Sequence, residues 1–240
     1  MSAQVTSLTG LRIWDLTGTD WKALAYGQPG DRDRRWVQWN GRRWLRKCEP
    51  RSLSEIAGYL VAEAIGLPVQ PWIGFFEREK SNEEASRIMT GILVERWPGI
   101  THLCNAGALS AKHAELVSLA LAITAFQRSE GEDPEFAISD RNGGIRLIDL
   151  DGFGPHFRYP PEGTSIQEYI DDSRKAFYRT LLEAVQLKVK AQFERSLRQV
   201  LLLKCRNLFD FSGHPHDQAI RLISCRAFDR RVAKIRRLLD

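Results

Sequence analysis

The chain has 240 residues, of which 43% are hydrophobic and 10% aromatic. This length and composition can bury a sizeable core, which excludes a disordered chain and leaves one large domain or two small ones. The formal net charge is +5, and the basic residues concentrate in two clusters, at 32–47 and 226–237. Such clusters can meet nucleic acid, acidic protein or nucleotide phosphates, although a solvated surface is the commoner explanation.

The longest apolar run, at 116–126, is much shorter than a membrane-spanning helix. The opening residues do not combine a basic start with an apolar segment, so no secretory signal is predicted. We therefore expect a cytoplasmic protein with no membrane partner.

The first element along the chain is a predicted β-hairpin at 35–47, in which two strand-like runs flank Asn40-Gly41. Side chains alternate along a strand, so Lys47 is expected on one face with Leu45, and Arg46 on the other. A helix follows from Ser52, where Ser52 and Glu55 have the spacing of a capping box, and it ends near Gly66.

Two further strands are predicted at 69–76 and 88–95, joined by a charged loop. A largely apolar stretch at 109–128 indicates a buried helix. Two short strands, at 136–139 and 145–148, form a second hairpin around a glycine-containing turn. The remainder, 166–240, has helical periodicity.

This order predicts an α+β fold with two lobes. A β-rich N-terminal lobe with one helix covers 1–97, and a mainly helical C-terminal lobe covers 98–240 and contains a catalytic-type hairpin at 136–149.

Cysteine and histidine give little sign of a metal or redox site. The four cysteines are scattered and are predicted to be buried thiols: Cys48, Cys104, Cys205 and Cys225. His214 and His216 flank Pro215 and are interpreted as part of a turn, with a metal site as the less favoured alternative.

Asp149 and Asp151 interrupt an apolar run at the end of the second hairpin, where partly buried carboxylates need partners or a cation. A strand lysine, a glutamate in the next helix and an aspartate after a later hairpin are the parts of a phosphoryl-transfer site. A metal motif of a sugar-nucleotide transferase is an alternative that fits the preceding helix and hairpin poorly.

The stretches "WLRKCEPRSLSEIAGYLVAEAIGLPVQPW", "GILVERWPG" and "EFAISDRNGGIRLIDLDGFG" resemble the HipA-like and phosphoinositide 3/4-kinase-like branch of the protein-kinase fold. The resemblance covers roughly residues 35–155 and implies an ATP- and Mg²⁺-dependent phosphotransferase. Lys47 would contact the nucleotide phosphates, Glu55 would pair with Lys47, and Glu95 to Trp97 would line the adenine pocket. Asp149 would bind the metal, with Asp151 as a second carboxylate or a support of the turn.

The chain departs from the family pattern in the loop after the buried helix. Glu130 stands where the family has its catalytic aspartate, and Glu135 where it has a metal-binding asparagine; Asp133 is a substitute for Glu130 if the loop is shifted. No glycine-rich phosphate loop is recognisable. A catalytically inactive pseudokinase that binds a protein partner through its basic C-terminal helices is therefore the alternative to a kinase. Nucleic-acid binding through 226–237 is less favoured, because no aromatic stacking motif accompanies the basic run.

Overall fold

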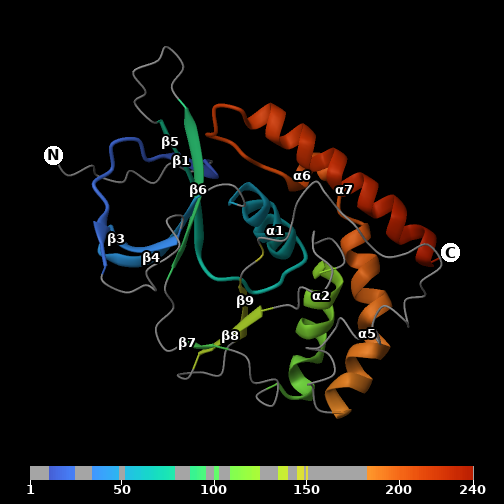
Figure 1. The fold of residues 1–240 in the computed structure, drawn as a ribbon. Helices are drawn as coiled ribbons and strands as arrows, with labels where there is room; N and C mark the ends of the chain where they lie inside the picture. The colour runs from blue at the N-terminus through green and yellow to red at the C-terminus, as the bar shows by residue number, and fades with distance from the viewer. Residues whose placement is uncertain are drawn as a thin grey trace. The chain divides into compact units, whose positions relative to one another are not determined.

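The computed structural model describes residues 11–24, 34–48, 52–78, 87–95, 100–102, 109–124, 135–139, 145–148, 150 and 183–239. The strands are β1 (Ile13–Asp15), β2 (Lys22–Ala23), β3 (Arg34–Trp39), β4 (Arg42–Cys48), β5 (Trp72–Arg78), β6 (Ile88–Glu95), β7 (Ile100–His102), β8 (Glu135–Ser139) and β9 (Ile145–Ile148). The helices are α1 (Ser52–Ala64), the 3-10 helix η2 (Ala111–His113), α2 (Ala114–Thr124), α5 (Glu183–Leu201), α6 (Cys205–Leu208) and α7 (Asp217–Leu239) (Figure 1).

The chain divides into two compact units, each built from separate stretches of sequence. The first contains 1–53, 71–96 and 210–222, and the second contains 54–70, 97–209 and 223–240. Helix α7 therefore begins in the first unit and continues into the second. The two predicted lobes were continuous stretches, whereas the structural units are not.

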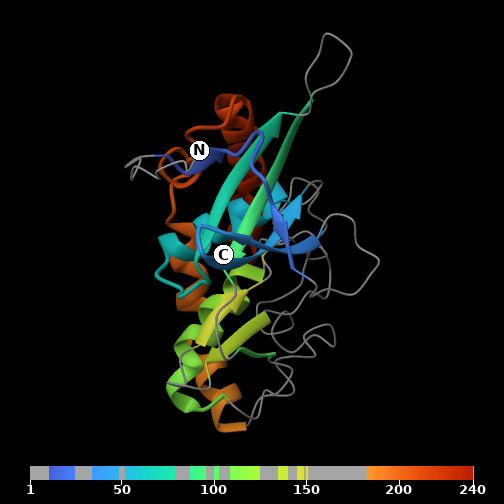
Figure 2. The same cartoon turned by 90° about the vertical axis from the view of Figure 1, so that its left-hand side faces the viewer.

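The first unit is built on a six-stranded sheet in the order β1-β5-β6-β4-β3-β2. β1 pairs with β5 in parallel, and all other neighbours are antiparallel. β5 and β6 form a long two-stranded ribbon, with the β3–β4 hairpin beside β6 (Figures 1 and 2). The predicted strand at 88–95 is confirmed in full, whereas the one predicted at 69–76 begins only at Trp72, after Pro71.

The predicted turn at Asn40-Gly41 is confirmed. Both residues have positive φ, 50° and 73°, as a two-residue hairpin loop of the I′ type requires. Asn and Gly adopt this conformation at little cost, so the local sequence sets the register that places Trp44 opposite Val37.

One face of this sheet carries a compact apolar cluster. Its buried members come from the strands and from the residue after β1: Leu16, Val37, Trp44, Cys48, Phe75 and Leu93. Three half-buried tryptophans pack on it: Trp14, Trp21 and Trp39. Gly91 belongs to the same arrangement, because a Cβ there would collide with the ring of Phe75.

Helix α1 starts and ends where the sequence predicts, but its first residue has another role. The helix ends before Gly66, whose φ of 77° is the left-handed conformation typical of a helix C-terminus. The hydroxyl of Ser52, predicted as a cap, instead donates a 2.9 Å hydrogen bond to the carbonyl of Thr90 in β6. The start of α1 is thereby attached to the sheet.

In the second unit, α2 and α5 pack side by side, and the sheet β7-β8-β9 is antiparallel throughout (Figures 1 and 2). α2 is buried on nearly all sides, as predicted for this stretch, and its Ser118 shares a 2.8 Å hydrogen bond with Ser196 of α5. The predicted β8–β9 hairpin is confirmed. The helical remainder is interrupted at 209–216, where Gly213 and Pro215 lie.

Within the first unit, the stretch 210–216 packs against β1. The backbone N–H groups of Arg12 and Ile13 donate to the carbonyl of Ser212 at 3.1 and 2.9 Å, respectively. Gly213 fits here because a Cβ would collide with the carbonyl of Ile13, and its φ of 96° suits glycine. In the described part of the chain, no helix is long and apolar enough to cross a membrane.

Candidate functional site

Lys47 lies near the end of β4, inside the six-stranded sheet, with Arg34 of β3 and Ile92 of β6 as its neighbours in register. Only 7% of the residue is exposed, which is rare for a lysine. An ammonium group at this depth needs anionic or hydrogen-bonding partners, because burial disfavours its charged form.

Arg46, next to Lys47, makes its contacts on the opposite face of the sheet. Its guanidinium donates a 2.7 Å hydrogen bond to Glu77 and lies 5.3 Å from the ring centroids of both Trp21 and Phe75. The indole N–H of Trp21 also donates to Glu77, at 2.7 Å. These contacts hold the Arg46 side chain on its own face of the sheet.

Glu55 lies in the first turn of α1 and is 1% exposed. A carboxylate at this position interacts favourably with the positive end of the helix dipole. Lys47 belongs to the first unit and Glu55 to the second, so their pairing stays a prediction.

A buried polar cluster that the sequence did not reveal joins β6 to the start of α7. His214 accepts a 3.0 Å hydrogen bond at Nδ1 from the backbone N–H of His216, so its neutral ring carries the proton on Nε2. That Nε2–H donates to the hydroxyl of Thr90 at 2.9 Å. Burial, followed by the nearby charge of His216, lowers the pKa of His214 to about 4, with Asp217 acting in the opposite direction.

The predicted turn at His214 and His216 agrees with these contacts. The backbone N–H of His214 donates to the carbonyl of Phe211 at 3.0 Å, and the backbone N–H of Asp217 donates to the carbonyl of His214 at 3.1 Å. Both ring nitrogens of His214 are engaged within the protein. Among the described residues there is no cluster of three side chains suited to holding a metal.

The β8–β9 hairpin places Glu135, one of the predicted metal ligands, at one end of a strand pair. Glu135 opens β8 and is in register with Ile148, the residue before Asp149 in the sequence. The hairpin is anchored to the connection after α1: Leu147 N–H donates to the carbonyl of Pro68 at 2.7 Å.

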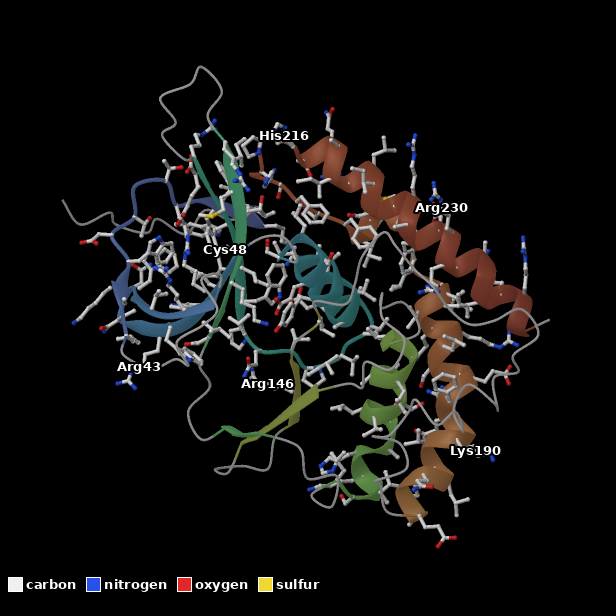
Figure 3. All side chains as sticks on the ribbon, viewed as in Figure 1. Arg43, Cys48, Arg146, Lys190, His216 and Arg230 are labelled. Atoms are coloured by element: carbon white, nitrogen blue, oxygen red, sulfur yellow. The ribbon has the colours of Figure 1, made fainter. Side chains whose placement is uncertain are left out.

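Arg146 adds a second contact to this anchor. It is half-buried and donates to the carbonyl of Val69 at 3.2 Å (Figure 3). Arg146 was not among the site residues predicted from the sequence. Its position in β9, three residues before Asp149, was the available signal.

Glu95 ends β6 and is held by two contacts. Its side chain forms an ion pair with Arg42 at 3.4 Å, and its backbone N–H donates to the carbonyl of Pro71 at 2.8 Å. The other predicted site residues lie outside the described part of the chain: Trp97, Glu130, Asp133, Asp149 and Asp151.

Of the cysteines, Cys48 is buried, as predicted, and Cys205 and Cys225 are half-buried; Cys104 lies outside the described residues. None of these three cysteines forms a disulfide. Cys205 donates to the carbonyl of Cys225 and to the carboxylate of Asp229, both at 3.4 Å. Burial, above all, raises the pKa of Cys205, which makes it a poor nucleophile.

No protein-family model matches the chain, and no curated protein matches its sequence. Among solved structures it is similar to the crystal structure of a Helicobacter pylori proinflammatory kinase, CtkA. The TM-score is 0.51 at 9% identity, and the match covers 90% of this chain and 93% of that chain. At this identity the likeness shows the fold alone. The α+β architecture is thus a protein-kinase-like fold, as the resemblance in the sequence implied.

Proposed function

We propose that this protein is an ATP- and Mg²⁺-dependent phosphotransferase of HipA-like type. The observation that carries the proposal is the burial of Lys47 within the sheet of a kinase-like fold, while the neighbouring Arg46 is engaged elsewhere. In this fold a strand lysine neutralises nucleotide phosphate oxygens. A lysine held in a sheet has little freedom to move, which suits a positioning role.

On the nucleotide side, Lys47 binds the phosphates and Glu55 orients Lys47. The burial of Glu55 supports this role, since a buried carboxylate is stable only with a partner. The adenine base lies against the connection from Glu95 to Trp97. Because the N–H of Glu95 is used by Pro71, other backbone groups of this connection bind the base.

On the metal side, Asp149 and Glu135 hold Mg²⁺, and Asp151 is a further carboxylate. Carboxylate oxygens are suitable ligands for this ion, and the register of β8 with β9 supports the joint use of Glu135 and Asp149. Bound Mg²⁺ neutralises charge on the phosphates during transfer. Glu130 or Asp133 orients the acceptor hydroxyl, which we propose belongs to a protein.

The first test is nucleotide binding. Thermal unfolding of the wild type should shift upward with MgATP, since a ligand at a hundred times its dissociation constant adds about 2.7 kcal/mol to stability. Lys47→Met should remove the shift. Arg43→Met is the matched control, because Arg43 is an exposed cation on the same strand (Figure 3). Equal shifts in Lys47→Met and wild type would refute the role of Lys47.

The second test is phosphate transfer to protein acceptors, including the protein itself. Asp149→Ala should abolish transfer, and Glu135→Gln should raise the Mg²⁺ concentration needed for half-maximal activity. Binding without transfer by the wild type would instead support the pseudokinase alternative. In that case Glu130 and Glu135, where the family has aspartate and asparagine, are the residues to restore: Glu130→Asp with Glu135→Asn should produce transfer.

A further inference from the structure

The outer face of α7 is a row of arginines. Arg226, Arg230 and Arg237 follow one another at helical spacing with Ala233 between them, and all four are exposed. The opposite face of the helix is buried through Phe228, Val232 and Ile235. Arg230 lies on the outer side of α7 in Figure 3.

These three guanidinium groups are not neutralised within the described part of the chain. None of them has an ion pair there, and Asp229, the acidic residue of the same stretch, instead accepts a hydrogen bond from the thiol of Cys205. Arg236 is occupied differently, since it donates to the carbonyl of Leu201 at the end of α5 at 3.3 Å. The outer face therefore presents three available positive charges.

We propose that this face of α7, defined by Arg226, Arg230 and Arg237, binds the phosphate backbone of a double-stranded nucleic acid. At 1.5 Å per residue, the three side chains span about 16 Å of helix. A duplex carries one negative charge per roughly 1.7 Å of its axis, so several phosphates lie within this reach. Arginine also presents a planar fork that donates two parallel hydrogen bonds to a phosphate.

Other polyanions fit this face less well. An anionic membrane would need the apolar side of the helix, which is buried in the protein. Single strands are bound with aromatic stacking, and no aromatic residue is exposed on this face. Protein interfaces usually have large residues at their centre in addition to arginine, and the residue between Arg230 and Arg237 on this face is Ala233. The exposed Leu222 and Ile223 lie one turn before Arg226, at the edge of the row and not between its arginines.

The test measures binding of the full chain to a fluorescent 20-base-pair duplex by anisotropy, as a function of salt. Three phosphate contacts predict a slope of log K against log salt steeper than about −2.7 once other contacts are included. Arg226→Gln, Arg230→Gln and Arg237→Gln combined should weaken binding at least tenfold and make the slope less steep by about 2.7. Arg230→Gln alone should make the slope less steep by about 1. This single variant replaces the triple variant if the latter fails to fold.

The matched control removes three exposed charges on other elements: Lys112→Gln, Lys188→Gln and Arg195→Gln. This control variant should bind the duplex as tightly as the wild type. Duplex DNA and duplex RNA are measured separately to identify the preferred form. Equal losses in the two triple variants would show a mere net-charge effect and overturn the proposal. So would tighter binding of a single strand, or binding of vesicles with anionic headgroups but not of a duplex.

Discussion

Protonation of His214 should destabilise the protein on acidification. His214 is 6% exposed, its Nδ1 accepts a hydrogen bond from His216 N–H, and its Nε2–H donates to the hydroxyl of Thr90. A second proton would occupy Nδ1, remove the first of these bonds and leave a buried charge near His216. The folded state therefore resists protonation, which the lowered pKa of His214 expresses.

The magnitude follows from linkage. In the unfolded chain the pKa of His214 returns to 6.5, whereas in the folded protein it is about 4. Between these two pH values the unfolded state binds more protons than the folded state. The contribution of His214 to the free energy of unfolding is therefore fully present above pH 6.5 and is lost as the pH falls towards 4. At 1.36 kcal/mol per unit, the gap corresponds to at most about 3 kcal/mol.

Urea unfolding from pH 7 to pH 4.5 measures this effect. Because carboxylates titrate in the same range, the informative quantity is the difference between wild type and His214→Gln, whose amide still donates to Thr90 but cannot be protonated. The wild type should lose up to about 3 kcal/mol more than the variant. In His216→Gln this loss should shrink, because the charge of His216 depresses the pKa of His214. Parallel curves for wild type and His214→Gln would refute the argument.

Three further outcomes can be checked by urea unfolding at pH 7. Gly91→Ala should cost about 1–3 kcal/mol, because the new Cβ collides with the ring of Phe75; an unchanged midpoint would contradict this packing. Ser118→Ala should cost about 1–3 kcal/mol by leaving Ser196 unpaired, whereas the double change to alanine should cost less than the sum of the two single changes. Gly213→Ala should lower the free energy of unfolding by more than about 1 kcal/mol, because φ is 96° and the new Cβ would collide with the carbonyl of Ile13. An unchanged free energy of unfolding would contradict this backbone conformation.

Much of the fold could be predicted from the sequence because its signals are local. Asn and Gly adopt positive φ at low cost, so Asn40-Gly41 between two strand-like runs predicted the first hairpin and its alternation. The β8–β9 hairpin was predicted from the same kind of signal. The helix from Ser52 to Ala64 was also recognisable, but the partner of the Ser52 hydroxyl was not, because Thr90 is 38 residues away in the sequence.

For the candidate site, too, local sequence predicted some features and contacts between distant residues decided others. The order of lysine, glutamate and aspartate along the chain indicated a phosphotransferase, and the alternation of β4 separated Arg46 from Lys47. Local sequence could not show that Arg46 pairs with Glu77 and lies beside Trp21. These residues reach Arg46 only through the pairing of distant strands.

The sequence by itself determined the hairpins, the helices and the residue types available for chemistry, because turns and periodic burial depend on neighbouring residues. Only the tertiary structure decided that Lys47 is buried while Arg46 is paired, and that 210–216 packs against β1 and β6. Those outcomes depend on contacts between residues far apart in the chain, which the spacing of residue types does not encode.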